Sequence, residues 1–423
     1  MHDQEITHQP SCEDELNVGL LTVAEAQARI LNGVTPVAAR ETVPVMQALG
    51  RVLAQDIVSP IDVPSHTNSA MDGYAVRAAD LPDDGVREFT VPGTSWAGRP
   101  WLEPIEPGQA VQIMTGGMMP DGADTVVMQE QVEREGDTVR IGAGHHCGQN
   151  VRQAGEDLAT GQQVFSAGRQ LSSADIGVLA SLGLGEVSVY RRLKVAFFST
   201  GDELRPVGEA LGPGEIHDSN RYTLHGMLQK LGVEIIDMGV VRDRRELIEQ
   251  AFREAAAGAD AIITSGGVSV GEADFVKETL EKLGSMSFWK IAMKPGRPVT
   301  FGHIDDAVFF GLPGNPVSVM VTFFVFVRQA LLKMAGGTGP SDVYTLHART
   351  TTPLRKRPGR YEFQRGVLEQ SGPGEFIVRS AGAQGSGILR SMSEANCFIL
   401  LGPDRTSVDI GGQVEVQPFQ NLI

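Results

Sequence analysis

Residues Ala261–Phe275 read AIITSGGVSVGEADF, and the interpretation of the whole chain starts from this stretch. It begins with a short apolar run that is typical of a buried parallel strand. A Ser-Gly-Gly turn follows, and Glu272 and Asp274 come just before a helical pattern. Glycine lets the backbone approach a ligand closely, and free N–H groups at a helix start attract negative charge. The stretch therefore predicts a phosphate-binding turn, with an ordinary connecting turn as the alternative.

The composition of the chain is that of an ordinary globular protein with an acidic balance. It has 423 residues, enough for several domains, and a net charge of −16. Non-specific nucleic-acid binding needs a basic face, so we expect no nucleic-acid partner. The longest apolar run, 319–327, is shorter than the ~20 residues that span a membrane, so we expect no membrane partner.

The ends and the cysteines indicate the compartment. Residues 1–18 are polar, without the apolar core of a signal peptide, and we expect a disordered tail there. The 3 cysteines are widely separated, so they form no disulfide framework and no Cys-x-x-Cys metal site. We therefore expect a cytoplasmic protein.

The first 185 residues predict a β-rich module flanked by helical segments. Thr22 and Glu25 form a capping-box pattern before a helix that should stop at Gly33, and Ser172 should cap a second helix. We expect 19–44 and 146–185 to form one discontinuous linking domain around a β module at 45–145. Short runs between Gly, Pro and Asp turns predict these strands: Val52–Val58, Phe89–Val91, Ala110–Met114, Thr125–Glu130 and Thr138–Ile141.

From Lys194 onward, strand and helix patterns alternate, which predicts an α/β domain at 186–336 built on a doubly wound parallel sheet. Asp243 and Glu246 are expected to cap one of its helices. The pattern changes again after Gly336, and 341–423 predicts a small C-terminal β domain. The chain is thus expected to be an α/β multidomain protein. The predicted elements of the α/β domain are strands at Val195–Phe198, Glu234–Val240, Asp260–Thr264, Ser287–Ala292, Pro298–Phe301 and Ala307–Gly311, and helices at Arg221–Leu231, Asp243–Ala257, Phe275–Leu283 and Pro316–Met334.

Four turns in this domain carry unusual chemistry, and each follows or joins predicted strands. Ligands bind at the carboxyl ends of the strands in an open parallel sheet, so the turns should share one edge. They are Ser199–Glu203 (STGDE), Ser265–Gly267 (SGG), Lys294–Pro298 (KPGRP) and Gly311–Pro316 (GLPGNP).

The side chains of these turns suit an anionic ligand with a divalent cation. Glycine turns offer N–H groups, and Lys290, Lys294 and Arg297 supply positive charge that the acidic protein otherwise lacks. Acids of the same region are hard oxygen ligands for a cation that bridges phosphates: Glu203, Asp243, Glu272 and Asp274. Taken alone, each residue also has a purely structural interpretation. Asp243 could be only a helix cap, and Lys290 could be only a solvated side chain. No P-loop and no G-x-S-x-G elbow occurs, so phosphoryl or nucleotidyl chemistry of another kind is predicted.

Seven segments together resemble the molybdopterin molybdenumtransferase family, which includes bacterial MoeA and the E domain of gephyrin. The resemblance runs in order from about Leu20 to the C-terminus. The segments are Asn68–Ala75 (NSAMDGYA), Thr115–Gly117 (TGG), Gly155–Asp157 (GED), Ser199–Glu203, Thr264–Asp274 (TSGGVSVGEAD), Lys294–Pro298 and Gly311–Pro316.

The resemblance implies a transferase that takes adenylylated molybdopterin and molybdate, uses Mg²⁺, releases AMP and places molybdenum on the dithiolene sulfurs. It implies a homodimer of four-domain subunits whose active site is shared between subunits, and a contact with the adenylyltransferase of the same pathway is possible. The implied catalytic residues are Asp72, Glu203, Asp243 and Asp274, and the implied metal ligands are Asp157, Glu203, Asp243 and Asp274. The implied binding residues are Thr115, Thr200, Ser265, Gly266, Gly267, Ser269, Lys290, Lys294, Pro313, Pro316, Arg365 and Ser386.

Two other functions stay open. The adenylyltransferase that makes the substrate resembles only the α/β domain, and the two β regions of this chain argue against that reading. A non-catalytic, pterin-binding scaffold is the second alternative, and the intact set of acids argues against it. Release of AMP on addition of molybdate and Mg²⁺ distinguishes all three.

Overall fold

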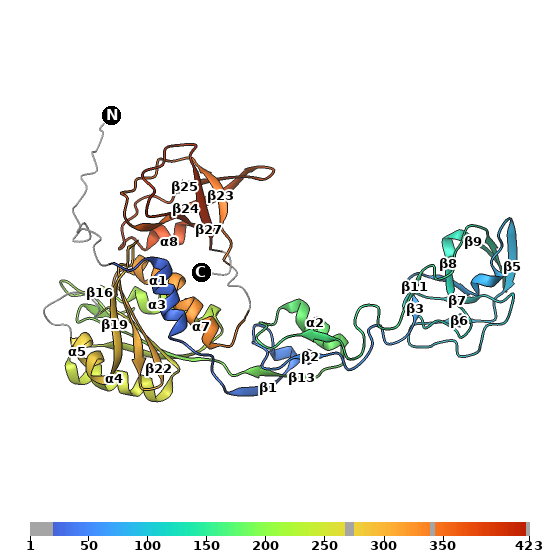
Figure 1. Cartoon of the computed structure of the whole chain (residues 1–423), viewed down its shortest axis with the longest axis horizontal. Coiled ribbons are helices and arrows are strands. Elements are labelled where there is room, and N and C mark those ends of the chain that lie inside the picture. Colours follow the sequence, from blue (N-terminus) through green and yellow to red (C-terminus); the bar gives the residue numbers. More distant parts are fainter. Residues whose placement is uncertain (1–19, 267–274, 339–342, 420–423) are drawn as a thin grey trace. The chain divides into compact units, whose positions relative to one another are not determined.

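A computed structural model describes residues 20–266, 275–338 and 343–419. The chain divides into two compact units. The larger contains the residues up to Glu41, residues 50–52 and the residues from Tyr190 onward. The smaller contains Thr42–Leu49 and Leu53–Val189. The predicted tail at 1–18, together with Gly267, Ser269, Glu272 and Asp274, lies outside the described residues. The units are described separately below (Figure 1).

The larger unit contains a six-stranded sheet in the order β17-β14-β18-β22-β21-β19. Strands β17, β14, β18 and β22 are mutually parallel, whereas β21 is antiparallel to both of its neighbours. The predicted parallel α/β sheet is thus confirmed for four neighbouring strands, and the sheet as a whole is mixed. Only Asp305 and Asp306 separate β21 from β22, too short a connection for a parallel crossover. The elements are β14 (Lys194–Thr200), β15 (Leu204–Arg205), β16 (Ile216–His217), α3 (Ser219–Lys230), β17 (Glu234–Val241), α4 (Arg245–Gly258), β18 (Ala261–Ser265), α5 (Phe275–Leu283), β19 (Gly284–Lys290), β20 (Met293–Lys294), β21 (Pro298–Ile304), β22 (Ala307–Leu312), α6 (Pro316–Thr322), the π-helical η4 (Phe323–Val327) and α7 (Arg328–Met334).

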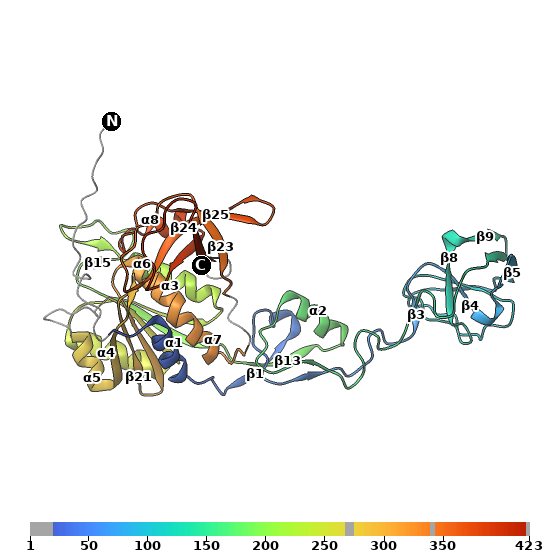
Figure 2. The same ribbon diagram turned by 45° about the horizontal axis from the view of Figure 1, so that its top comes forward.

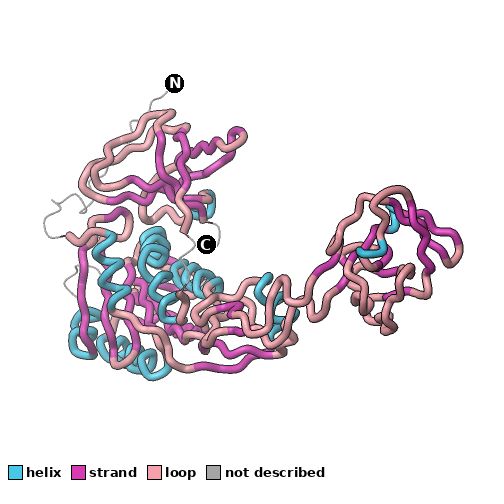
Figure 3. Tube along the Cα trace, turned by 45° about the vertical axis from the view of Figure 1, so that its right-hand side comes forward, coloured by secondary structure: helices cyan, strands magenta, loops and turns pink. Residues whose placement is uncertain are grey.

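Helices cover both faces of this sheet (Figures 1 and 3). On one face α4 and α5 bury Ile248, Phe252 and Leu280 against alternate strand residues. On the other, α3 and the α6–α7 stretch bury Leu224 and Leu228 with Phe197 and Phe310. Burial on two faces explains why the strands read as continuous apolar runs.

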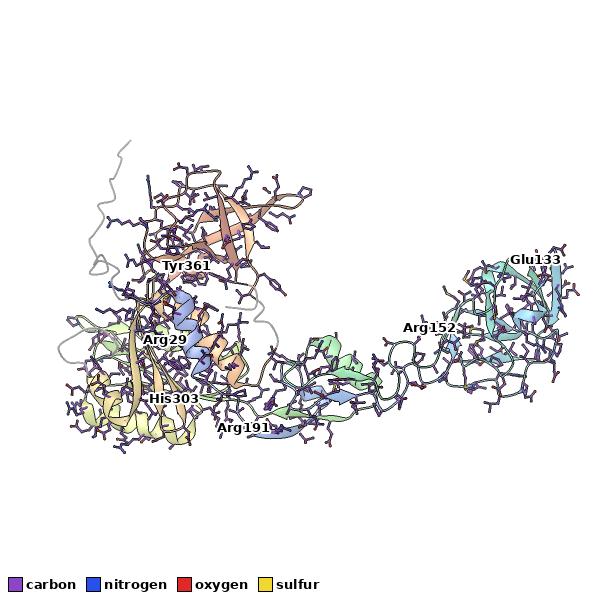
Figure 4. The ribbon with its side chains drawn as sticks, viewed as in Figure 1. Arg29, Glu133, Arg152, Arg191, His303 and Tyr361 are labelled. Carbon is purple, nitrogen blue, oxygen red and sulfur yellow. The ribbon has the colours of Figure 1, made fainter. Side chains whose placement is uncertain are left out.

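Helix α1 (Val23–Asn32) packs on the second of these cores, beside α7 (Figure 2). Its capping box at Thr22 and its end at Gly33 match the prediction. Ala26 and Ile30 are fully buried there, and His303 on β21 hydrogen-bonds the Gly33 carbonyl oxygen at 3.0 Å (His303 is labelled in Figure 4). Helix α1 packs within the larger unit, and the expected grouping of 19–44 with 146–185 stays a prediction. The other boundaries stay predictions.

Residues 316–334 form a continuous helical stretch with a π-helical turn in its middle. Within the described residues it is the one helix long and apolar enough to span a membrane, but 83% of its most apolar window is buried inside the protein. Burial of this kind is typical of a core helix.

The C-terminal part of the larger unit is a small barrel-like β domain, shown almost wholly as strand and loop in Figure 3. Its sheet order is β20-β24-β25-β23-β27-β26, and an additional β24–β26 pairing closes it. The predicted small β domain is therefore confirmed. Its elements are β23 (Leu346–Thr350), β24 (Tyr361–Gly372), β25 (Glu375–Ser380), α8 (Arg390–Glu394), β26 (Cys397–Leu401) and β27 (Gln413–Pro418).

The smaller unit consists mainly of short strands in small sheets, as its turn-rich sequence predicts. The largest have the orders β6-β7-β4-β8 and β5-β10-β9. The expected strand at Val52–Val58 is reduced to Ile57–Val58. The elements are β1 (Arg40–Pro44), η1 (Val45–Gln47), β2 (Ile57–Val58), β3 (Asn68–Ser69), β4 (Gly73–Val76), η2 (Ala78–Asp80), β5 (Val86–Thr90), β6 (Thr94–Ser95), β7 (Val111–Ile113), β8 (Thr125–Met128), η3 (Gln129–Gln131), β9 (Val132–Glu135), β10 (Thr138–Gly142), β11 (Val151–Arg152), β12 (Gln163–Phe165), α2 (Ser173–Ser181, capped by Ser172) and β13 (Glu186–Tyr190).

Candidate functional site

The four chemistry-bearing turns lie on one edge of the six-stranded sheet. The parallel register sets Ser199 beside Ser265 and Ser265 beside Leu312, so the turns after β14, β18 and β22 leave the sheet together. The third turn, Lys294–Pro298, reaches the edge differently, because it precedes strand β21 and does not follow a parallel strand. Strand β21 starts at this edge because it is antiparallel, and its Pro298 pairs with Lys290 at the end of β19. Lys290 and the turn before Pro298 therefore reach the same edge.

The backbone at Gly266 is packed so closely that only glycine fits. Its φ is +89°, and a Cβ there would lie 2.6 Å from the carbonyl oxygen of Thr200. A Cβ on Gly314 would lie 3.9 Å from the Gly266 Cα, so the turns after β18 and β22 are neighbours. The Gly266 N–H itself donates to the Leu312 carbonyl oxygen at 3.2 Å, which fixes the turn between β18 and β22.

Two hydroxyls beside this turn differ in what they contact. The Ser265 hydroxyl lies 3.0 Å from that of Ser199, and both serines are buried, so Ser265 holds the two strands together. Thr200 is 4% exposed, and its Oγ1 is buried without a hydrogen-bond partner among the described residues. Thr200 thus has an unused polar atom at the edge, whereas the Ser265 hydroxyl serves to position the turn.

The acids follow β14 and β17. The Glu203 carboxylate folds back over Gly201, where a Cβ would lie 2.6 Å from Oε2. Asp202 Oδ1 accepts a hydrogen bond from the Asp243 N–H at 3.4 Å, which links the two strand ends. Asp202 was not among the predicted site residues, although it stands between two that were.

The predicted capping of α4 by Asp243 and Glu246 is wrong. The residue at the N-cap is Arg244, whose side chain makes no capping hydrogen bond. A tight turn places the Arg244 N–H 2.7 Å from the Arg242 carbonyl oxygen, which shifts the helix start past Asp243. Asp243 therefore belongs to the strand-end turn.

The positive charge at this edge comes from residues between the end of β19 and the start of β21. Lys290 is exposed, and Lys294 and Arg297 are half-buried. The Arg297 Nε is buried without a partner among the described residues. Near Pro313 and Pro316, the Val317 N–H donates to the Ser386 carbonyl oxygen at 3.0 Å, bringing a loop of the C-terminal domain to this helix start.

Arg365 anchors that loop. It is 1% exposed, and its guanidinium donates to Ser391 Oγ and to the carbonyl oxygens of Ala383 and Gly385, at 3.0 to 3.3 Å. Burial lowers the pKa of Arg365 to about 10. These contacts make Arg365 a positioning residue for the Ser386 loop in the structure described.

In the smaller unit, the structure brings Asp72 and Thr115 together. Thr115 donates to Asp72 Oδ1 from its N–H at 2.7 Å and from its hydroxyl at 2.8 Å. Both hydrogen bonds, and most strongly the one from the backbone N–H, hold the pKa of the half-buried Asp72 carboxyl below its ordinary value. Asp157 is exposed, and its N–H donates to the Val63 carbonyl oxygen at 3.0 Å.

A metal site made wholly of protein side chains is not visible in the part of the chain described. No group of three or more His, Cys, Asp or Glu residues suited to a metal occurs there. An apolar cavity of about 620 Å³ lies elsewhere in the larger unit, lined by residues that include Val23, Phe324, Tyr361 and Phe398. None of the predicted site residues lines it.

Sequence comparison assigns a family to this arrangement. Family models described as the MoeA N-terminal region (domain I and II), a probable molybdopterin binding domain and the MoeA C-terminal region (domain IV) match residues 21–183, 196–333 and 347–419. A Haemophilus influenzae protein named molybdopterin molybdenumtransferase is 44% identical over 96% of this chain and 100% of its own length. The chain belongs to the molybdopterin molybdenumtransferase family.

Other relatives agree with this family. Dictyostelium discoideum gephyrin is 32% identical over 90% of this chain and 60% of its own length. The crystal structure of the molybdopterin biosynthesis moeA protein from Pyrococcus horikoshii matches with a TM-score of 0.82 at 32% identity, covering 94% of this chain and 100% of that one. The family fold predicted from the sequence is thus confirmed.

Proposed function

We propose that this member of the molybdopterin molybdenumtransferase family inserts molybdenum from molybdate into adenylylated molybdopterin during molybdenum cofactor biosynthesis, with release of AMP. The observation that carries the proposal is the gathering of four strand-end turns, three cations and several acids on one sheet edge. The name of the Haemophilus relative supports the reaction class.

The glycine turn and the cations bind the anionic parts of the substrates. Gly266 and Gly267, which lack side chains, leave room for a phosphate beside the turn, and Thr200 and Ser269 donate to its oxygens. Lys290 and Lys294 bind the oxyanion and phosphate charge, since ammonium groups act as point charges. Pro313 and Pro316 shape the adjoining loop, and Arg365 fixes Ser386 beside it.

The acids fit a divalent cation of the Mg²⁺ type. Such ions bind one or two carboxylates and complete their shell with waters and phosphate oxygens, so the lack of a three-residue cluster among the described residues is compatible with one. Glu203 and Asp243 would hold it, together with Asp274. When bound, Mg²⁺ neutralises charge on the phosphoanhydride. The chain's own part is to position the residues that carry these carboxylates, as Asp202 does by accepting a hydrogen bond from the Asp243 backbone N–H.

The protein acts as a cytoplasmic homodimer, with Asp72 and Thr115 of one subunit completing the site of the other. Asp72 is half-buried, and its hydrogen bonds from Thr115 lower its pKa and so favour the ionised form. A carboxylate held in one orientation is suited to act on a ligand bound to a second subunit. A contact with the adenylyltransferase of the pathway would hand over the substrate.

The test is release of AMP from adenylylated molybdopterin by the purified protein after molybdate and Mg²⁺ are added. We expect AMP and molybdenum cofactor in equal amounts, and little AMP without molybdate. Folded protein that binds the substrate but releases no AMP would instead be a scaffold. Formation of the adenylylated substrate from ATP and molybdopterin would identify an adenylyltransferase.

A further inference from the structure

Asp218, at the start of α3, has a buried carboxylate oxygen that the fold does not use. The residue is 3% exposed. Its Oδ1 accepts the Arg221 N–H at 3.1 Å and so caps the helix. Its Oδ2 is buried and has no hydrogen-bond partner among the described residues. Leaving such an acceptor unpaired is costly, so the position calls for a donor from outside the fold.

The nearest arginines along the chain do not supply this donor. The Arg221 Nε donates to Asp237 Oδ1 at 2.7 Å, on the neighbouring strand β17. Arg205 donates to Glu215. Both cations are therefore committed to other carboxylates.

Asn220 adds a second unused acceptor in the same turn of helix. Its Nδ2 donates to the Gly314 carbonyl oxygen at 2.7 Å, which fixes the orientation of the amide. The Asn220 Oδ1 that this leaves is buried and also lacks a partner among the described residues. Because Gly314 is the neighbour of Gly266, this end of α3 borders the phosphate-binding edge.

Both unpaired atoms at the start of α3 are acceptors, and this selects the chemistry of the ligand. Phosphate and molybdate offer oxygens and would be repelled by a carboxylate. The amino edge of adenine offers one N–H donor beside ring nitrogens that accept. The pterin ring offers two adjacent donors, the 2-amino group and N3–H. A carboxylate is the natural partner for such a paired donor edge.

We propose that Asp218 and Asn220 form the subsite for the donor edge of the pterin ring. This inference rests on the proposed function, which supplies a pterin as substrate. The subsite fixes the orientation in which the substrate binds. Its phosphates lie at the Gly266 turn, and its pterin ring lies at the start of α3. Because a carboxylate repels phosphate, Asp218 also prevents entry of the substrate in the opposite orientation.

The test compares the binding of pterin and lumazine, in which a carbonyl replaces the 2-amino group, by saturation-transfer NMR on the full-length protein. We expect the wild type to bind pterin about tenfold more tightly, because lumazine sets its carbonyl against the acceptor. Asp218→Asn keeps a cap acceptor but can present an NH₂ group in place of Oδ2, so the preference should vanish or reverse. Asp218→Ser also keeps a cap acceptor and should abolish the preference.

Asp306→Asn is the matched control, since this exposed acid lies in the β21–β22 turn at the opposite edge of the sheet. It should keep the wild-type preference, and the melting temperature of each variant reports whether it folds. The inference is overturned if wild type binds both probes equally, if it binds neither at millimolar concentration, or if both folded Asp218 variants keep the preference. The assay involves no AMP release, so a failure of the proposed reaction is recognised separately.

Discussion

Thr115 donates two hydrogen bonds to a single carboxylate oxygen of Asp72, one from its N–H and one from its hydroxyl, at 2.7 and 2.8 Å. Both residues were predicted to serve the site, and 43 positions separate them in sequence. The structure shows a half-buried carboxylate that is held in one orientation.

Thr115→Val should raise the Asp72 pKa. The variant keeps the backbone hydrogen bond but loses the hydroxyl, so the pKa of Asp72 should move part of the way back toward about 3.9. Thr115→Ser keeps both donors and should leave the pKa unchanged. NMR titration of the Asp72 carboxyl measures this. An identical pKa in wild type and Thr115→Val would mean that the hydroxyl does not hold the carboxylate.

Gly266→Ala should inactivate the enzyme more strongly than it destabilises the fold. The added Cβ would lie 2.6 Å from the Thr200 carbonyl oxygen, which pushes the phosphate-binding turn out of position. We expect AMP release to fall at least about a hundredfold, as displacements of this kind do in active sites. The matched control is Gly374→Ala, where φ is +76° but no atom lies within 4 Å of the new Cβ. Equal AMP release by the two variants would contradict the placement of the phosphate at Gly266.

Asp260→Asn should lower stability at neutral pH. Asp260 accepts two hydrogen bonds from Arg191, at 2.7 and 2.6 Å, and one from the Lys194 N–H at 2.8 Å (Arg191 is labelled in Figure 4). Loss of the charge should cost about 2 kcal/mol of unfolding free energy. Asp306→Asn, at the exposed β21–β22 turn, should cost almost nothing.

The ion pair of Asp260 and Arg191 also predicts that the stability of the protein depends on pH. Burial raises the pKa of the Asp260 carboxyl, but the hydrogen bonds from Arg191 and the Lys194 N–H outweigh burial and hold that pKa below its ordinary value. The stabilisation is therefore fully present above about pH 3.9, the pKa of an unfolded Asp, and is lost as pH falls through the folded pKa. Urea unfolding should show the wild-type advantage at neutral pH and a smaller one in acid. An advantage that grows toward acid would reverse the assigned shift.

Two inactive variants should restore activity when their subunits mix. Asp72→Asn and Glu203→Gln homodimers are each expected to release no AMP. If Asp72 acts across the dimer, a mixed dimer contains one site with both native acids. Random subunit exchange should therefore give about a quarter of wild-type activity. No recovery, with mixed dimers demonstrated by mass spectrometry, would place both residues in the site of the same subunit.

Sequence patterns predicted local features well where the determining residues are close together. The capping box at Thr22 and the helix cap at Ser172 were predicted because each depends only on residues three positions apart. The shared strand-end edge followed from the alternation of strands and helices. The capping of α4 was wrong because a tight turn before Arg244, invisible in the pattern, moves the helix start.

Other features depend on contacts between distant residues and could not be read from the chain. Asp218 looks like an ordinary helix cap in sequence, and only its buried Oδ2 shows that a ligand donor is needed. Arg365 matched a family motif for oxyanion binding, but its three protein acceptors are set by the fold of the C-terminal domain.

A crystal structure with AMP and molybdate bound tests the central claim most directly. The account predicts the AMP phosphate at the Gly266 turn beside Thr200, and an oxyanion within reach of Lys290 or Lys294. Ligands bound only away from this edge, for example in the apolar cavity lined by Tyr361 and Phe398, would contradict it.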